Sequence, residues 1–209
     1  MKLCLQTLHD ITNEIANLVL SEHGWNPIDA LRTSWASLCK AFLIEAGWFR
    51  EGITPKTSEY LENGLKSTGV SVILTHFCLL LGNTAGRQIT TVPTDGAVLF
   101  RLAALSLRLW DDLGSAQDEK QDGFDGSYVY YYMKEHEVSL ESAIKHTMEM
   151  ISDAWKSLNK ECLLSNHFSQ IVKKAILNSV RMMRVMYTYK NQRLPMLEQY
   201  TQLIFLEPI

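Results

Sequence analysis

The sequence predicts an all-α bundle, and three observations lead to this prediction. Hydrophobic residues make up 46% of the 209 residues, which is enough to bury a core as one domain. These residues recur at intervals of three and four along most of the chain, without the strict alternation that is typical of strands. No internal repeat and no low-complexity linker divides the chain. We therefore expect helices packed around one core.

The first part of the chain predicts three helices. Four apolar residues share a face of the first, namely Leu8, Ile11, Ile15 and Leu18. Asn26 and Pro27 form an N-cap and first-turn pair for the second helix. Apolar residues then repeat at helical spacing: Ile28, Leu31, Trp35, Leu38 and Phe42. A third helix is expected to open at Pro55, run towards Leu81 and stop at Gly82.

An unusual group of residues interrupts the third helix. Ser67, Thr68 and Gly69 precede Val70 inside an otherwise apolar helical run. Ser and Thr side chains can bond back to the backbone and Gly loosens it, so the segment between Lys66 and Ser71 is predicted to be kinked or locally non-helical. The alternative is a tolerated packing site for small residues within a straight helix.

The second part of the chain predicts further helices separated by a turn. Thr94 or Asp95 caps a fourth helix, and the segment 122–126 is rich in turn-forming residues. Ser139 caps a helix that extends to about Cys162. The next helix runs from about 168 to 189 and places five residues on one side: Ile171, Ala175, Asn178, Met182 and Val185. Pro195 starts a last short helix.

Composition and charge exclude several classes of protein. The net charge is -3 with both signs interspersed, so we expect no nucleic-acid partner. The longest apolar run, 70–81, is interrupted by polar residues and is too short to span a bilayer. The amino end reads as an amphipathic helix without the features of a secretory or transit peptide. Four widely spaced cysteines indicate reduced thiols of an intracellular protein: Cys4, Cys39, Cys78 and Cys162.

The segment "LWDDLGSAQDE" contains the residues most suggestive of chemistry. Asp111, Ser115 and Glu119 are four residues apart, so their oxygens line one edge of a helix over about two turns. Carboxylate and hydroxyl oxygens are ligands suited to Mg²⁺ or Mn²⁺, with positions left for water or phosphate oxygens. Arg108 precedes this edge by one turn and Lys120 follows it, and both could bind phosphate.

The competing interpretation of this segment is a solvated helix face, which is the more common origin of such spacing. Two details favour a cavity wall instead. The preceding run "VLFRLAALSLRLW" is strongly apolar, so the helix should be deeply buried just before the motif. Asp111 and Asp112 are also adjacent like charges, which destabilise each other unless a cation is near.

The segment "RLWDDLGSAQDE" resembles the second metal-binding motif of plant terpene synthases. Three flanking stretches also resemble this family: "HGWNPIDALRTSWASLCKAFLIEAGWF", "DGSYVYYYMKEH" and "LPMLEQYTQLIF". Their sequences are most similar to those of plant enzymes that make the acyclic alcohols linalool and nerolidol. The resemblance implies a class I terpenoid synthase α-bundle around an apolar cavity. It also implies Mg²⁺-dependent ionisation of geranyl or farnesyl diphosphate, in the plastid or the cytoplasm.

The resemblance also implies roles for single residues. Asp111, Ser115 and Glu119 would hold a metal ion, and Arg108 would contact the diphosphate. Tyr187 matches a tyrosine of the cavity. The remaining substrate-binding candidates are Asp112, Lys120 and the kink residues Ser67, Thr68 and Gly69. Four other aromatic residues are interpreted as core: Trp35, Trp48, Trp155 and Tyr60.

The sequence departs from the family in one important respect. The first metal motif of the family, Asp-Asp-x-x-Asp, is absent from residues 1–209, so we expect one domain, 1–209, truncated at its amino end and equivalent to the second half of the catalytic domain. Such a chain is expected to be inactive alone. The alternative hypothesis is a non-catalytic helical remnant that associates with a full-length relative. A di-iron bundle is excluded because no histidine has Glu three residues before it.

Overall fold

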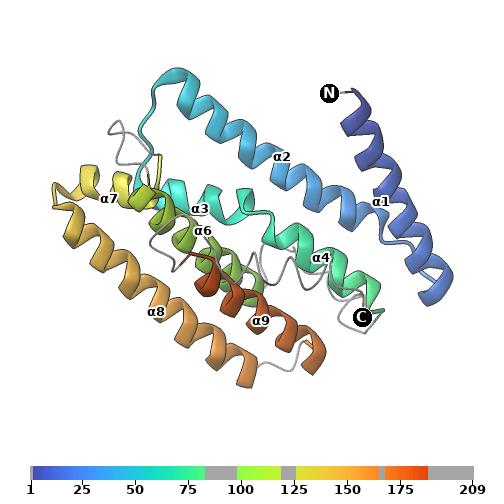
Figure 1. Ribbon diagram of the computed structural model, residues 1–209. Coiled ribbons are helices and arrows are strands. Elements are labelled where there is room, and N and C mark those ends of the chain that lie inside the picture. The colour runs from blue at the N-terminus through green and yellow to red at the C-terminus, as the bar shows by residue number, and fades with distance from the viewer. Residues whose placement is uncertain (1, 83–97, 119–125, 165–167, 188–209) are drawn as a thin grey trace, which may run out of the picture.

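The computed structural model describes residues 2–82, 98–118, 126–164 and 168–187, and within these residues it contains helices joined by turns (Figure 1). This architecture confirms the all-α prediction. The helices are α1 (Lys2–His23), α2 (Ile28–Glu51), α3 (Thr57–Ser67), α4 (Val70–Leu80), α6 (Val98–Asp118), α7 (Tyr128–His136), α8 (Leu140–Leu164) and α9 (Gln170–Tyr187). None of the described helices combines the length and apolarity needed to cross a bilayer.

Helix α6 lies at the centre of the bundle. It packs against α3, α4, α7, α8 and α9, and Figure 1 shows it between the α3–α4 pair and the α8–α9 pair. Its apolar first turns supply much of the core, because Leu99, Phe100, Ala103 and Leu109 are almost completely buried. The apolar run that precedes the aspartates therefore buries the helix as predicted.

Side-chain oxygens accept backbone hydrogen bonds at the start of three of the helices. The Oγ atom of Ser139 accepts a hydrogen bond from the backbone N of Ser142 at 3.3 Å, which confirms the predicted cap of α8. Ser127 Oγ accepts from Tyr130 N at 3.2 Å at the start of α7, a helix that the apolar periodicity does not predict. At the start of α2, Asn26 Oδ1 accepts from Ile28 N at 3.0 Å, but the N-cap residue is Pro27 and not Asn26 as predicted. The expected caps Thr94 and Asp95, and Pro195, lie outside the described residues.

The predicted kink is confirmed. Helix α3 ends at Ser67 and α4 begins at Val70, because Gly69 adopts a left-handed backbone conformation with φ 72°. The Thr68 hydroxyl donates to the carbonyl of Leu65 at 3.1 Å. Local bonds from the side chain thus replace part of the helical ladder at the break, so the third predicted helix is two helices.

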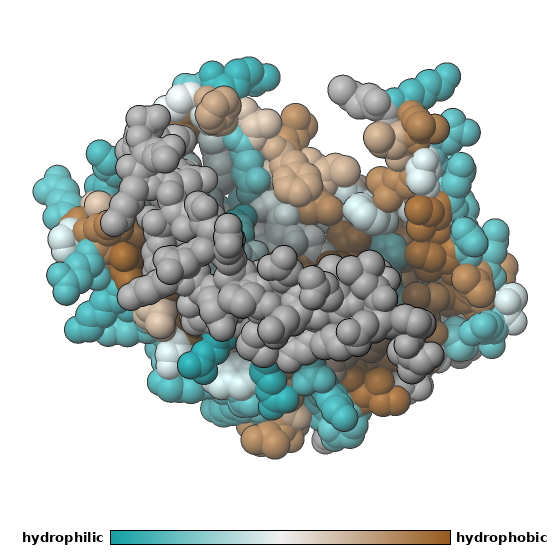
Figure 2. All heavy atoms as spheres, viewed as in Figure 1, coloured by the Kyte–Doolittle hydropathy of each residue, from teal (hydrophilic) through white to brown (hydrophobic). Residues whose placement is uncertain are grey.

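The two amino-terminal helices turn part of their expected apolar face outward. In α1, Ile11 and Leu18 are 48% and 45% exposed, whereas Thr12, Ala16 and Val19 are buried. Figure 2 shows hydrophobic residues on the side of α1 that faces α2, with mainly hydrophilic residues along its outer side. In α2 the exposed apolar side chains include Phe42, Leu43 and Phe49. We use the name α1–α2 apolar face for the exposed apolar side chains of the two helices: Leu3, Leu5, Ile11 and Leu18 of α1, and Phe42, Leu43 and Phe49 of α2.

Helix α9 shows a similar difference. Its predicted side begins at Ile171 and includes Met182, and both are more than half exposed. The buried side is rotated by one residue and consists of Val172, Ile176, Val180 and Met183. Both sides have helical spacing, so periodicity alone does not identify the one that faces the core.

Candidate functional site

The polar site lies on the side of α6 that faces α3. Arg108 Nη2 donates to Asp111 Oδ2 and forms an ion pair with Asp112 Oδ1 at 2.9 Å. The side chains of Arg108 and Asp112 are only 17% and 4% exposed, whereas that of Asp111 is 40% exposed. One guanidinium is therefore shared between an accessible carboxylate and a buried one.

The buried carboxylate of Asp112 is held by two further donors. The Tyr60 hydroxyl donates to both of its oxygens, at 3.0 and 2.9 Å, and the backbone N of Tyr128 donates to Oδ2 at 3.0 Å. Burial raises the pKa of Asp112 to about 6, although Arg108 and the two donors act in the opposite direction. Burial and the charge of Asp112 also raise the pKa of Tyr60, so its hydroxyl remains a neutral donor.

The stem of Arg108 runs along α3 at a glycine. A Cβ atom at Gly64 would lie 2.8 Å from Arg108 Cδ, which is closer than real Cβ contacts. Burial by itself would lower the pKa of Arg108, but the surrounding charges, chiefly Asp112, outweigh it and raise the pKa. The Nε atom of Arg108 is buried and has no hydrogen-bond partner among the described residues. A larger residue at position 64 would displace this side chain.

Tyr187 reaches the same site from the end of α9. Its hydroxyl hydrogen-bonds to Asp111, and burial followed by the Asp111 charge raises its pKa. Its ring lies against α6 at Gly114, where an added Cβ would be 3.1 Å from Tyr187 Cδ1. The structure thus brings Arg108, Asp111, Asp112 and Tyr187 together, although they lie on two helices that are far apart in sequence.

The remaining residues of the predicted metal set are only partly described. Helix α6 continues to Asp118, so the backbone of Ser115 follows Asp111 by one turn on the same edge. Glu119 and Lys120 lie outside the described residues. Within the described part of the chain, no group of three or more His, Cys, Asp or Glu residues could hold a metal ion. Asp111 is the one predicted ligand whose described side chain is accessible, and the metal set remains a prediction.

The helix break is attached to α2 by residues that the sequence did not single out. Ser67 Oγ donates to Glu45 Oε1 at 2.6 Å, and Asn63 Nδ2 donates to the same oxygen at 3.2 Å. Asn63 also donates to the carbonyl of Ala41 at 3.0 Å. Glu45 and Asn63 gave no sequence signal because each is an isolated polar residue in a helical pattern. The hydroxyl of Ser67 is already bonded here, and substrate contacts of Ser67, Thr68 and Gly69 remain predictions.

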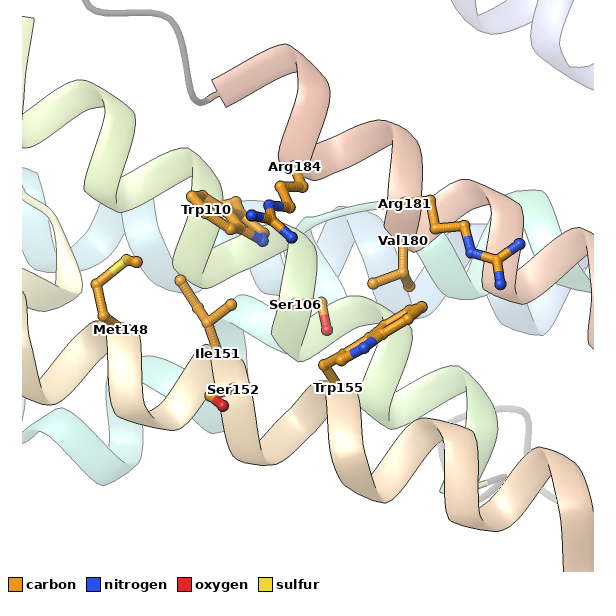
Figure 3. Close-up of a pocket in the computed structure, with 9 residues that line it drawn as sticks. All are labelled: Ser106, Trp110, Met148, Ile151, Ser152, Trp155, Val180, Arg181 and Arg184. Atoms are coloured by element: carbon orange, nitrogen blue, oxygen red, sulfur yellow. The ribbon is translucent and has the colours of Figure 1, made fainter.

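A separate hollow lies on the other side of α6. It has a volume of roughly 500 Å³ and lies between α6, α8 and α9. Figure 3 shows Ser106 and Trp110 of α6 on its wall, with the Trp155 ring facing the side of α9 that carries Arg181. The Arg181 guanidinium lies 5.9 Å from the centre of the Trp155 ring. Ser106 and Trp110 each lie two residues from Arg108, so this hollow is on the opposite side of the helix.

Comparisons with known proteins place this geometry in a family context. The model of the "Terpene synthase family, metal binding domain" matches residues 1–157. The chain is 49% identical to an (E)-nerolidol synthase from Cannabis sativa over 96% of its own length and 37% of the relative. It is 48% identical to an S-(+)-linalool synthase from Arabidopsis thaliana, over 93% of this chain and 35% of that protein.

A solved structure agrees with these matches. Isoprene synthase from grey poplar, in complex with three Mg²⁺ ions and dimethylallyl-S-thiolodiphosphate, superposes with a TM-score of 0.91 at 29% identity. The alignment covers all of this chain and 40% of that protein. The chain thus spans little more than a third of the length of the curated relatives that it matches.

Proposed function

The chain belongs to the terpene synthase family, and from this premise we propose that its α6 site binds the diphosphate of a prenyl substrate together with divalent metal. The observation that carries the proposal is the single guanidinium of Arg108 shared between Asp111 and Asp112 at the end of a buried helix. The substrate class is geranyl or farnesyl diphosphate, and the reaction class is formation of an acyclic alcohol of the linalool or nerolidol type.

The electrostatics support diphosphate binding. Arg108 is largely buried and always protonated, so it presents a fixed positive charge with a planar set of donors. Negative charge develops on a diphosphate as its bond to carbon breaks, and a fixed cation in a water-poor site stabilises that charge. Tyr187 adds an aromatic ring next to Asp111, which suits a cavity that must accommodate a carbocation.

The donor set fits Mg²⁺ or Mn²⁺. The accessible carboxylate of Asp111, with Ser115 and Glu119 four and eight residues later in the sequence, would supply hard oxygen ligands. When bound, a divalent ion there would neutralise the leaving diphosphate as a Lewis acid. We propose that Lys120 adds a second positive charge. Asp112 is instead engaged with Tyr60, Tyr128 and Arg108, so we propose that it acts through Arg108.

We propose that the 209-residue polypeptide alone does not turn over prenyl diphosphates. The Asp-Asp-x-x-Asp motif does not occur in this sequence. The α6 site therefore supplies one of the two metal-binding motifs of the family, each of which forms one wall of the diphosphate site. Leaving-group departure requires several positive centres at once. The second candidate function is a non-catalytic chain that pairs with a full-length relative, and the exposed α1–α2 apolar face favours it.

Titration calorimetry with inorganic diphosphate tests the proposal. We expect binding that requires Mg²⁺ and that weakens by roughly 10- to 100-fold in Arg108→Ala, because a charge-assisted bond contributes about 1.5–3 kcal/mol. Arg101→Ala is the matched control, since Arg101 is on the same helix but pairs with the exposed Glu62. Equal affinity in Arg108→Ala and the unmodified chain would show that the diphosphate site is elsewhere, and no binding by either would refute the proposal.

A further inference from the structure

Tyr60 has an unusual place in the core. Its ring is 6% exposed and packs against that of Tyr131, with ring centres 4.9 Å apart. Its hydroxyl lies within 3.0 Å of both oxygens of Asp112. A phenylalanine could fill the same volume, whereas the hydroxyl must be desolvated and therefore needs a partner. The buried carboxylate of Asp112 provides that partner.

Helix α3 contacts the Arg108–Asp112 pair at two points that are one turn apart. Tyr60 donates to Asp112 from the first turn, and Gly64 provides the surface on which the Arg108 stem lies. The backbone N of Tyr128 adds a third element, α7, to the same carboxylate. Residues of α3, α6 and α7 therefore hold the Arg108–Asp112 ion pair. Of the three charged side chains, that of Asp111 is the most exposed to solvent.

The two carboxylates compete for one nitrogen. Arg108 Nη2 contacts both Asp111 and Asp112, and a buried carboxylate with fewer donors attracts a neighbouring cation more strongly. The Tyr60 hydroxyl supplies one of the hydrogen-bond donors that the buried carboxylate of Asp112 needs. If this donor is removed, the guanidinium should move towards Asp112 and away from the accessible edge where Asp111 lies.

We propose that Tyr60 is a positioning residue that, through Asp112, holds the Arg108 guanidinium at the accessible edge of α6 where it can meet diphosphate. The part of this inference that concerns diphosphate rests on the proposed function. Tyr60 itself does not touch the ligand, because its hydroxyl is bonded to Asp112 and its ring is in the core.

Two variants that remove the same atom separate this role from general stability. Tyr60→Phe deletes the hydroxyl that faces Asp112. Tyr128→Phe deletes a hydroxyl from a tyrosine that is just as buried, but that hydroxyl faces His146 at 3.3 Å while the backbone N still donates to Asp112. Circular dichroism checks that both variants are folded. If Tyr60→Phe is not folded, Asp112→Asn removes the charge at the other end of the same link.

The first readout is independent of any ligand. In ¹⁵N NMR spectra, the Arg108 Nε–H signal, identified by its loss in Arg108→Ala, should exchange slowly with water in the unmodified chain and in Tyr128→Phe. It should shift and exchange differently in Tyr60→Phe, or in Asp112→Asn if that variant is used. An Arg108 signal that is identical in the unmodified chain and the Tyr60→Phe or Asp112→Asn variant would overturn the positioning role.

The second readout is calorimetric titration with inorganic diphosphate and Mg²⁺. We expect Tyr60→Phe to bind about five- to tenfold more weakly, a loss of the size that one hydrogen bond typically contributes, and Tyr128→Phe to bind unchanged. Equal weakening in both variants would refute a specific role for Tyr60. If the unmodified chain binds no diphosphate, the proposed function fails, and the NMR comparison still decides whether Tyr60 positions Arg108.

Discussion

The surroundings of α6 and the α1–α2 apolar face differ in what covers their hydrophobic side chains. Phe100 and Leu109 of α6 are completely buried, whereas Phe49 and Leu43 of α2 are 80% and 73% exposed. The buried carboxylate of Asp112 on α6 also accepts hydrogen bonds from the neighbouring helices α3 and α7. Nothing in the described part of the chain covers the α1–α2 apolar face. The α6 region is thus a buried core, whereas the α1–α2 region leaves apolar side chains exposed, as is typical of surfaces that bind a partner.

The proposed site and the exposed apolar side chains therefore lie in different parts of the molecule. The residues that hold the proposed site belong to the buried core around α6. The site can therefore keep its geometry while the apolar side chains of α1 and α2 are exposed to solvent. Glu45 is the exception, because it lies on α2 and fixes the helix break between α3 and α4. Substitutions in the two regions should therefore have unequal effects, which the following predictions rank from largest to smallest.

The largest difference is expected between two phenylalanines. Phe100→Ala should lower the free energy of unfolding by about 3–5 kcal/mol, because it leaves a cavity in the core. Phe49→Ala should change it by less than about 0.5 kcal/mol, since most of that ring is already in contact with water. Urea denaturation followed by circular dichroism measures both, and similar losses would contradict the contrast between the regions.

The next largest effect is expected at Glu45. Glu45→Ala should lower the free energy of unfolding by about 1–2 kcal/mol, because Ser67 and Asn63 lose their acceptor. Glu51→Ala is the control on the same helix, since Glu51 forms only an exposed pair with Arg50. The same denaturation experiment compares them. A loss in Glu45→Ala no greater than in the control would mean that the break does not depend on α2.

The cysteines report the same contrast without any substitution. Cys4 and Cys39, on α1 and α2, are exposed, whereas Cys78 and Cys162 are buried. Burial raises the pKa of the Cys78 thiol to about 12, which removes its reactive thiolate at neutral pH. An aromatic disulfide reagent should therefore react quickly with two thiols and with all four only after unfolding. Fast reaction of Cys78 would indicate that the core is open.

The smallest effect is expected from the exposed pair of Glu62 and Arg101. A hydrogen bond from Arg101 lowers the pKa of Glu62, so the pair stabilises the fold above the ordinary carboxyl pKa and loses this contribution as the pH falls through the lowered value. The expected contribution is below about 0.5 kcal/mol, because both side chains are about half exposed. Glu62→Gln should be slightly less stable than the unmodified chain in urea denaturation at pH 7, and this difference should shrink as the pH is lowered towards 3.

Much of the fold follows from the sequence, but the orientation of several helices does not. The helical period, the Ser139 cap and the break at Gly69 were predictable because each depends on local chemistry. The inward side of α1 and α9 was not, because apolar residues occupy more than one side of each helix. Which side faces the core is decided by packing against other helices, and a residue such as Val172 lies only one step from Ile171.

The candidate site shows a similar limit. The grouping of Arg108 with Asp111 follows from their three-residue spacing, and the resemblance to terpene synthases indicated Tyr187. The link between Tyr60 and Asp112 joins residues 52 positions apart. A tyrosine in an apolar helical pattern is normally interpreted as core, and only the packing of α3 on α6 brings its hydroxyl to the carboxylate.

The central claim is that the α6 site is one functional wall of a prenyl diphosphate site that needs a second wall. Product analysis by gas chromatography tests it most directly, with Mg²⁺ and geranyl or farnesyl diphosphate supplied to three purified proteins. These are the 209-residue chain, its fusion to the part of the Cannabis sativa (E)-nerolidol synthase that the chain does not cover, and the same fusion with Asp111→Asn. We predict an acyclic alcohol from the unmodified fusion and none from the other two. Robust linalool or nerolidol formation by the 209-residue chain alone, or undiminished formation by the Asp111→Asn fusion, would contradict the account.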